Sequence, residues 1–335
     1  MSSIYVDFIS PNGHVKINKL YFSELNNDDY YSCKTSYMKD ADCVAHRLNF
    51  YSPWEGEPQG IRHAVEQLVF TMVFFILNIK TMLKIKNIVF LSYSPIWNYP
   101  LILVFNKLLR KNIYVLEHNS IPSANENDGV KFNIKTKMFQ LSSSLLTHLV
   151  YEDYIGVYLE QKFNAHYLVV KHPIIGSSKI ESYDKDKVIP LIFSPSSSSE
   201  KQVIDWLKDI TINSDVISMV KSASNFEESG FIAKQYFENY EELMSGCDII
   251  VVGSKFEERV SGVFYEALLT PKSILMLDSK FSRAAVECYP NVHVFDSCEQ
   301  LKELIYKVIR QGRLNLKTYN IENHNLESSI SRVIK

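Results

Sequence analysis

The stretch "VVGSKFEERVSGVFYEALL", residues 251–269, passes from an apolar run into a helical pattern and carries two acids, Glu258 and Glu266. Ser261 has the side chain of a helix N-cap, and Gly262 lets a ligand approach the backbone closely. The first N–H groups of a helix are unpaired and attract anions such as phosphate. Carboxylates accept hydrogen bonds from hydroxyls, so acids on both sides of the helix start suit a ligand with hydroxyls around a phosphate group. A nucleotide sugar has that layout.

The composition is that of an ordinary globular protein, with 46% hydrophobic and 22% charged residues. A length of 335 residues predicts about two domains. The net charge of −2 gives no reason to expect nucleic acid as a partner. The five cysteines form no CxxC pair and no zinc-ligand spacing with histidine, so we expect free thiols.

The chain shows no targeting or membrane-spanning pattern. Residues 1–10 lack the basic region and long apolar core of a signal peptide. The apolar run at 68–79 is shorter than the ~20 residues that a membrane span needs. We therefore expect a cytoplasmic protein, with the inner face of the cytoplasmic membrane as a possible site of attachment.

Short β-rich apolar runs alternate with longer helical patterns, which predicts two doubly wound, Rossmann-like α/β domains. The first series has expected strands at 4–10, 87–93, 112–118, 147–151 and 167–171, and helices near 62–84, 98–110, 131–144 and 152–163. The second has expected strands at 188–194, 215–220, 230–235, 248–254, 273–278 and 292–296, and helices near 200–209, 238–245, 261–269, 281–288 and 297–311. Ligands of such sheets bind beyond the carboxyl ends of the strands, so the loops there are candidate sites.

Residues 240–304 resemble the donor-binding half of GT-B glycosyltransferases, especially those similar to family 4. In that family a small residue and an Asp lead into a strand, which is followed by a Ser and by two Glu separated by seven residues. The matching positions here are Cys247, Asp248, Ser254, Glu258 and Glu266. The resemblance implies two Rossmann-like domains facing across a cleft. It also implies that Glu258 touches the donor sugar and Glu266 the ribose hydroxyls.

The same resemblance implies a division of the chain. We expect an acceptor-side N-terminal domain at 1–172, a polar linker at 173–187, a nucleotide-sugar-binding domain at 188–312, and a helical C-terminal segment at 313–335 that packs back toward the first domain. His118 resembles the histidine that closes an N-terminal-domain strand and reaches the donor sugar, so His118 and Glu258 are the catalytic candidates. The acceptor or phosphate loop candidates are Gly13, His14 and Asn119.

One departure from the family concerns the diphosphate. The loop that opens the second domain has an Arg and then a Lys in the family, whereas this chain has Ser196 and Lys201. Arg259 stands where the family has Gly and is expected to supply the lost charge, unless it only pairs with a neighbouring glutamate. Lys201 is either a phosphate-binding residue or a solvated residue at the start of a helix. The expected donor-binding residues are Ser196, Lys201, Arg259, Ser261, Gly262, Val263 and Glu266.

We therefore expect a glycosyltransferase that moves a sugar from a nucleotide-diphosphate donor to a saccharide or lipid-linked saccharide in synthesis of bacterial surface polysaccharide, such as capsule or lipopolysaccharide. Retention of anomeric configuration is implied by the resemblance, with no cofactor and no metal. An inverting reaction would need a base, with candidates Asp7, Glu24, Asp28 and Asp29. The Asp-x-Asp triplets at 40–42 and 184–186 do not directly follow an apolar strand, as a metal–diphosphate site would.

Two other functions stay open, a nucleotide-sugar epimerase and a non-catalytic partner that kept the fold. A dehydrogenase and a kinase are disfavoured, because neither GxGxxG after the first strand nor GxxxxGK is present.

The acceptor is predicted from the surface of the first half. Lysines follow the apolar helix, among them Lys80 and Lys84, and aromatic residues such as Phe74 and Phe75 lie nearby in the sequence. Cations beside apolar groups attract anionic lipid headgroups, which predicts peripheral contact with an anionic membrane.

Overall fold

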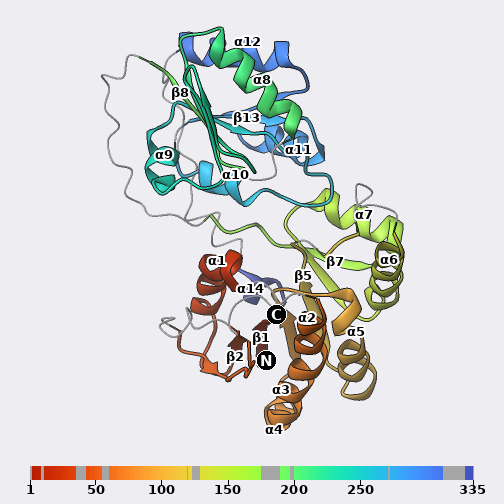
Figure 1. The fold of residues 1–335 in the computed structure, drawn as a ribbon. Helices are drawn as coiled ribbons and strands as arrows, with labels where there is room; N and C mark the ends of the chain where they lie inside the picture. The colour runs from red at the N-terminus through yellow and green to blue at the C-terminus, as the bar shows by residue number, and fades with distance from the viewer. Residues whose placement is uncertain are drawn as a thin grey trace. The chain divides into compact units, whose positions relative to one another are not determined.

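A computed structural model of the chain describes residues 2–8, 11–34, 43–54, 60–118, 120–122, 129–174, 189–196, 200–270, 272–311 and 329–334 (Figure 1). The chain splits into two compact units. Unit 1 is Met1–Pro173 with His324–Lys335, and unit 2 is Ile174–Asn323. None of the helices in the described ranges is long and apolar enough to cross a membrane.

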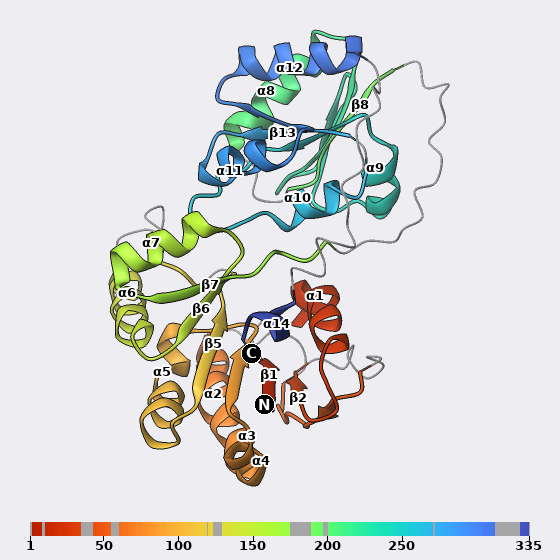
Figure 2. The ribbon, with the colours of Figure 1, turned by 180° about the vertical axis from the view of Figure 1, so that it is seen from behind.

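Unit 1 is built on a parallel sheet of seven strands in the order β3-β2-β1-β4-β5-β6-β7. Figure 2 labels β1, β2, β5, β6 and β7 of this sheet. The strands are β1 Ser3–Asp7, β2 Tyr30–Cys33, β3 His46–Arg47, β4 Asn87–Phe90, β5 Asn112–Leu116, β6 Thr147–Val150 and β7 His166–Val169. β1, β4 and β6 are almost entirely buried, as expected for strands that are covered on both faces. The direction of strand addition reverses between β1 and β4, so the switch point of this sheet lies there.

Helices cover the sheet of unit 1 on both faces. They are α1 Pro11–Ser23, α2 Ile61–Val65, α3 Thr71–Leu77, α4 Ile79–Lys84, α5 Pro95–Leu103, α6 Val130–Ser143, α7 Asp153–Phe163 and α14 Ile330–Val333, with π-helical turns η2 Glu66–Phe70 and η3 Val104–Leu108. The expected helix near 62–84 is therefore a series, α2-η2-α3-α4. Ser329, which precedes α14, hydrogen bonds to Glu24 at the end of α1, so this C-terminal turn belongs to unit 1.

Unit 2 contains a second seven-stranded sheet, in the order β10-β11-β9-β8-β12-β13-β14. Its strands are β8 Leu191–Ser194, β9 Ile217–Lys221, β10 Phe226–Glu228, β11 Phe231–Lys234, β12 Ile249–Val252, β13 Ser273–Leu277 and β14 Val292–Phe295. All neighbours pair in parallel except β10 and β11, which form an antiparallel hairpin at one edge. The switch point of this sheet lies between β8 and β12.

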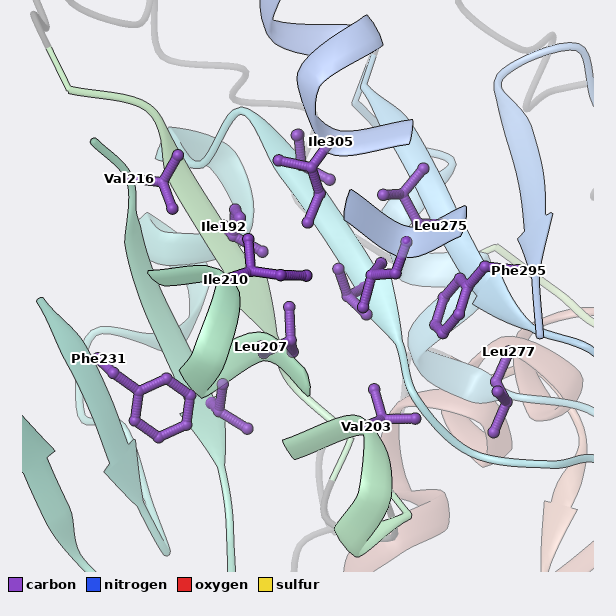
Figure 3. Packing of buried hydrophobic residues seen from close by; sticks show 14 of the residues in the cluster. Ile192, Val203, Leu207, Ile210, Val216, Phe231, Leu275, Leu277, Phe295 and Ile305 are labelled. Atoms are coloured by element: carbon purple, nitrogen blue, oxygen red, sulfur yellow. The ribbon is translucent and has the colours of Figure 1, made fainter. Parts of the chain in front are cut away.

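The helices of unit 2 are α8 Lys201–Ile212, α9 Tyr240–Gly246, α10 Gly262–Ala267, α11 Lys280–Cys288 and α12 Cys298–Gln311. α8 and α12 pack on one face of the sheet (Figure 3). Apolar residues at helical spacing, such as Leu207 and Ile210 on α8 and Leu301 and Ile305 on α12, meet strand residues such as Phe295. This cluster holds the strand ends of unit 2 in place.

The predicted fold class is confirmed, since both units are doubly wound α/β structures. Four elements were not predicted, namely α1, β2, β3 and β10. α1 begins at Pro11, inside the turn-rich sequence after the first strand. The prediction of a loop at Gly13 and His14 is therefore wrong, because both residues lie in the first turn of this helix. β2 and β3 are short strands of mixed polarity, which leave little periodic signal.

Candidate functional site

The carboxyl ends of β8 and β12, at the switch point of unit 2, carry two buried serines. Ser196 follows β8 and Ser254 follows β12, and their hydroxyl oxygens lie 2.9 Å apart. The backbone N–H of Glu200 donates to the carbonyl of Gly253 at 2.8 Å, so the start of α8 also lies at the end of β12. Ligands of doubly wound sheets bind at this place. The structure therefore brings Ser196 and Ser254 together, although 58 positions separate them in sequence.

Glu258 lies in the loop after β12 and is held by the start of α11. Its side chain is 8% exposed, and Oε1 lies 3.5 Å from Nζ of Lys280. The backbone N–H of Phe281 donates to the carbonyl of Phe256 at 3.1 Å, which fastens the loop to α11. Lys280 was not among the predicted site residues. The available signal was its position just after β13, at the same edge of the sheet.

The predicted N-cap is confirmed, because the hydroxyl of Ser261 accepts a hydrogen bond from the amide of Phe264 at 3.3 Å. An anion would then meet the amides of Gly262 and Val263. Gly262 is exposed, and a Cβ added there would meet nothing within 4 Å. α10 has six residues, so its dipole is weaker than that of a long helix and the cations of the site matter more.

Glu266 lies on α10 and is partly buried. Its Oε2 accepts a hydrogen bond from the phenol of Tyr240 at 2.8 Å. Burial, together with the charge of Glu266, raises the pKa of Tyr240, so this phenol stays protonated as a donor. Tyr240 is the first residue of α9 and follows β11, and it was not predicted. It fixes one oxygen of Glu266, while a carboxylate retains further acceptor positions for ligand hydroxyls.

The two predicted cations are both exposed but differ in their surroundings. The guanidinium of Arg259 lies 5.3 Å from the centre of the Phe256 ring, in the loop between Ser254 and Ser261. Lys201 is the first residue of α8 and lines a groove of about 470 Å³. The groove runs between α8 and the strands β9 to β11, and its other lining residues are Ile204, Asp205, Lys208, Lys221, Ser222, Ala223, Ser224, Phe226, Phe231 and Ala233. Among the donor candidates within the described ranges, Lys201 is the one that borders it.

His118 follows β5 in unit 1 and contacts an aromatic cluster. Its Nε2 lies 3.3 Å from the hydroxyl of Tyr151, and the two rings meet edge to face. The ring of His172 lies on the same tyrosine at 4.6 Å between ring centres, and its Nδ1 lies 2.8 Å from the carbonyl oxygen of Pro173. Asn119, the neighbouring candidate, lies outside the described residues.

A buried network supports the residues next to His118. Glu117 Oε1 lies 2.6 Å from Nδ1 of His148, and neither side chain is exposed. Glu117 also accepts a hydrogen bond from Ser120, on the far side of the same turn. Nε2 of His148 lies 3.2 Å from the hydroxyl of Ser143. Glu117 and His148 thus anchor the turn that presents His118, and no local sequence pattern pairs these two residues.

The four candidate bases of unit 1 differ in exposure. Asp7 is fully buried, accepts a hydrogen bond from Asn18 at 2.6 Å, and is bonded by Ser92 across the switch point between β1 and β4. Asp29 is buried and accepts a hydrogen bond from the amide of Ser3 at 2.9 Å. Burial raises the pKa of Glu24, and Asp28 is exposed. Asp7 and Asp29 therefore hold structure rather than face an acceptor, and the side chain of His14 lies outside the described residues.

Metal ligands were not expected. Within the ranges that the structure describes, no three His, Cys, Asp or Glu side chains lie close enough to hold a metal ion. The triplets at 40–42 and 184–186 lie outside those ranges. Metal independence thus stays a prediction.

No protein-family model and no curated protein matches the chain. Solved structures do match it. The structure of Anabaena HepE in complex with UDP and glucose matches over 99% of this chain and 97% of that chain, with a TM-score of 0.65 and 10% identity. A glycosyltransferase from Rickettsia africae matches over 99% of this chain and 95% of that chain, with a TM-score of 0.63 and 10% identity.

The chain has the GT-B fold. The glycotransferase of kitacinnamycin matches over the same 99%, with a TM-score of 0.57 and 9% identity. At such identities the likeness shows the fold alone. The expected GT-B architecture of two Rossmann-like domains is therefore confirmed, and the narrower resemblance to family 4 stays a prediction.

Proposed function

We propose that the chain is a glycosyltransferase that moves a sugar from a nucleotide-diphosphate donor to a saccharide or lipid-linked saccharide acceptor. The observation that carries the proposal is the cluster at the carboxyl edge of unit 2. There Ser196 and Ser254 meet at 2.9 Å, and both Glu258 and Glu266 flank the start of α10. HepE, which has the same fold, was solved with UDP and with UDP-glucose, and this supports a nucleotide sugar as the donor class.

The leaving diphosphate gains negative charge as the bond to the sugar breaks. Fixed positive groups that point at it lower the barrier, because they need no rearrangement during the reaction. In this proposal Lys201, Arg259 and the amides of Gly262 and Val263 supply that potential. Lys280 adds a cation at the same edge, held by Glu258.

The acids take the hydroxyls of the donor. Glu266, oriented by Tyr240, accepts hydrogen bonds from the ribose, and Glu258 accepts them from the sugar. His118, whose Nε2 lies 3.3 Å from the hydroxyl of Tyr151, is kept as a proposed catalytic residue. We propose a retaining reaction in which the donor phosphate assists the acceptor hydroxyl. It needs neither a cofactor nor a metal.

The biological setting that we propose is synthesis of bacterial surface polysaccharide at the inner face of the cytoplasmic membrane. A lipid-linked acceptor is presented at that surface. The support is the lysine-rich surface of unit 1, where Lys80, Lys84 and Lys107 are exposed.

Thermal unfolding with UDP, GDP, CDP, dTDP and their sugars tests the donor site. A ligand at a hundred times its Kd stabilises the folded state by about 2.7 kcal/mol, a readily measured shift. We expect one nucleotide family to raise the midpoint of the wild type. Glu266→Ala should lose this response because the ribose loses its acceptor. Glu228→Gln, which changes an exposed acid of the same unit, serves as the control and should keep it.

The outcome separates the alternatives. A response to no nucleotide, with the protein folded, contradicts the donor site and favours a non-catalytic partner. A response that survives in Glu266→Ala places the nucleotide elsewhere. If a nucleotide sugar binds and is consumed without any acceptor, with release of free sugar, the epimerase is favoured over the transferase.

A further inference from the structure

The helical series α2-η2-α3-α4 of unit 1 exposes a continuous row of aliphatic side chains, here named the outer ridge. Its members are Ile61, Val65, Val69, Met72, Val73, Ile76, Leu77, Ile79 and Leu83. Ile61, Leu77, Ile76 and Leu83 are 81%, 69%, 61% and 60% exposed. Scattered surface apolar residues are ordinary, whereas a contiguous row of this length marks an interaction surface.

The outer ridge is not the face by which these helices hold the fold. Phe74, Phe75 and Met82 are at most 3% exposed and face inward. The ring of Phe75 meets the ring of Phe105 on η3 at 4.6 Å between centres. The expectation that Phe74 and Phe75 would form part of a membrane-facing surface is therefore wrong. The aromatic side of α3 packs inward, and its aliphatic side is exposed.

The neighbouring segment η3 also exposes aliphatic side chains. Phe75 and Phe105 join α3 to η3, and Nζ of Lys111 donates to the carbonyls of Leu83 at 3.1 Å and Ile85 at 2.6 Å, just beyond η3. Leu108 on η3 is 74% exposed and Val104 is 42% exposed. Exposed aliphatic side chains are thus found on η3 as well as on the neighbouring series α2-η2-α3-α4.

Within residues 60–116 the exposed charged side chains are all cationic. Residues 60–116 contain seven cations, Arg62, Lys80, Lys84, Lys86, Lys107, Arg110 and Lys111, and one acid, Glu66. Glu66 is 1% exposed and pairs with Lys34 at 2.8 Å, so it adds no negative charge to the surface. Arg62, Lys80 and Lys84 are exposed on the same helices as the outer ridge.

We propose that the outer ridge is a docking surface for an anionic lipid bilayer, with α2-η2-α3-α4 lying along the membrane and its aliphatic side chains entering the headgroup boundary. A helix with an aliphatic outer face and flanking cations binds in this manner. A second copy of the chain fits poorly, since it would bring the like-charged Arg62, Lys80 and Lys84 of both copies together, while Glu66, the one acid of residues 60–116, is buried. An anionic bilayer supplies both the apolar layer and the negative charge.

This inference deepens the proposed function, because it names the surface through which a lipid-linked acceptor would be met. It rests on that function only for the identity of the acceptor. Vesicle binding is measured without donor or acceptor, so its failure is distinct from a failure of the nucleotide experiment.

The test is co-sedimentation of the full chain with vesicles of phosphatidylcholine containing phosphatidylglycerol, compared with phosphatidylcholine alone. We expect binding to the anionic vesicles that weakens as the salt concentration rises. Ile76→Ser with Leu77→Ser should lower the partition coefficient about tenfold or more, because two exposed aliphatic groups no longer enter the bilayer. Lys80→Gln with Lys84→Gln should lower it by a similar factor.

Matched controls come from unit 2. Ile212→Ser with Val286→Ser removes two exposed aliphatic side chains there, and Lys302→Gln with Lys307→Gln removes two exposed cations of α12. Both control variants should bind as the wild type does. Far-ultraviolet circular dichroism of each variant shows that it is folded.

Four results would overturn the inference. The first is no binding to anionic vesicles, and the second is equal binding to both vesicle types. The third is a dimer of the wild type in sedimentation velocity that is absent in the variant Ile76→Ser with Leu77→Ser. The outer ridge would then be an interface between two copies of the chain. Equal losses in the ridge and control variants also count against it, since binding would then not be localised.

Discussion

The helices that cover the two sheets bury apolar side chains in the same way, but their outer faces differ in composition. In unit 1 the series α2-η2-α3-α4 buries Phe74 and Phe75 and exposes the aliphatic outer ridge among cations. In unit 2 α8 and α12 bury Leu207 and Ile305 in the same manner but expose acids and bases together. The inner faces are constrained by packing on a parallel sheet. The outer faces are not constrained by this packing, so their composition indicates which partners each unit binds.

The largest expected effect lies on the inner faces, where the two units should behave alike. Phe75→Ala should lower the free energy of unfolding by about 3–5 kcal/mol and Leu207→Ala by about 2–5 kcal/mol, because each leaves a cavity in a buried cluster. Urea unfolding measures both. A small effect at Phe75 would break the comparison, since it would mean that α3 is not held by its inner face.

A smaller effect is expected from the ion pair that α8 has on its surface. Nζ of Lys208 lies 2.9 Å from Oε2 of Glu228 on β10, with both side chains more than a third exposed. Glu228→Gln should cost about 0.2–1 kcal/mol of stability, and less at high salt. Glu227→Gln changes the neighbouring exposed acid and is the control. A loss well above this range would mean that the pair is not a surface contact.

The ion pair between Arg283 of α11 and Asp278 is expected to make a small, pH-dependent contribution to stability as well. The guanidinium of Arg283 donates to Asp278 at 2.8 Å and lowers the pKa of that carboxyl. Because the folded pKa lies below the unfolded one, the stabilisation is present above the ordinary carboxyl pKa and is lost as the pH falls through the folded value. The melting midpoint of Asp278→Asn should therefore lie below that of the wild type at pH 7, with the gap closing as the solution is acidified below about pH 4. If the difference in melting midpoint between the wild type and Asp278→Asn grew in acid, the expected direction of the pH dependence would be wrong.

The smallest effect on folding is expected at the outer faces themselves. Ile76→Ser in unit 1 and Ile212→Ser in unit 2 should each change the free energy of unfolding by about 0.5 kcal/mol or less, because both side chains are already exposed. Urea unfolding of the two variants checks this. If Ile76→Ser were strongly destabilising, the outer ridge would be a packing surface within the chain, and its exposure would need another explanation.

Much of the fold was predictable because it depends on local patterns. Fully apolar runs such as 249–252 and 274–277 marked buried parallel strands, and Ser261 before a helical pattern marked an N-cap. The elements that were missed, such as α1 and β10, carry weak or misleading local signals. Pro, Asn and Gly at the start of α1 read as a turn, although proline is well suited to the first turn of a helix.

The candidate site was predictable in part, for the same reason. Glu258 and Glu266 stand out within one stretch of sequence, but their partners Lys280 and Tyr240 come from other strand ends. A rule that flags polar residues after every strand would have found both. The support of Glu117 by His148 follows no such rule, because only the pairing of β5 with β6 brings the two residues together.

The sequence by itself determined the class of fold, the alternation of strands and helices, and the chemistry of the helix start at Ser261, because these follow from contacts between residues that are near in the chain. Only the tertiary structure decided that Ser196 meets Ser254, that Glu258 is held by Lys280, and that the apolar series 61–84 turns its aromatic side inward. Those outcomes depend on strand order and on which face of a helix the sheet covers. Periodicity shows that a helix has two sides, whereas packing selects the side that is buried.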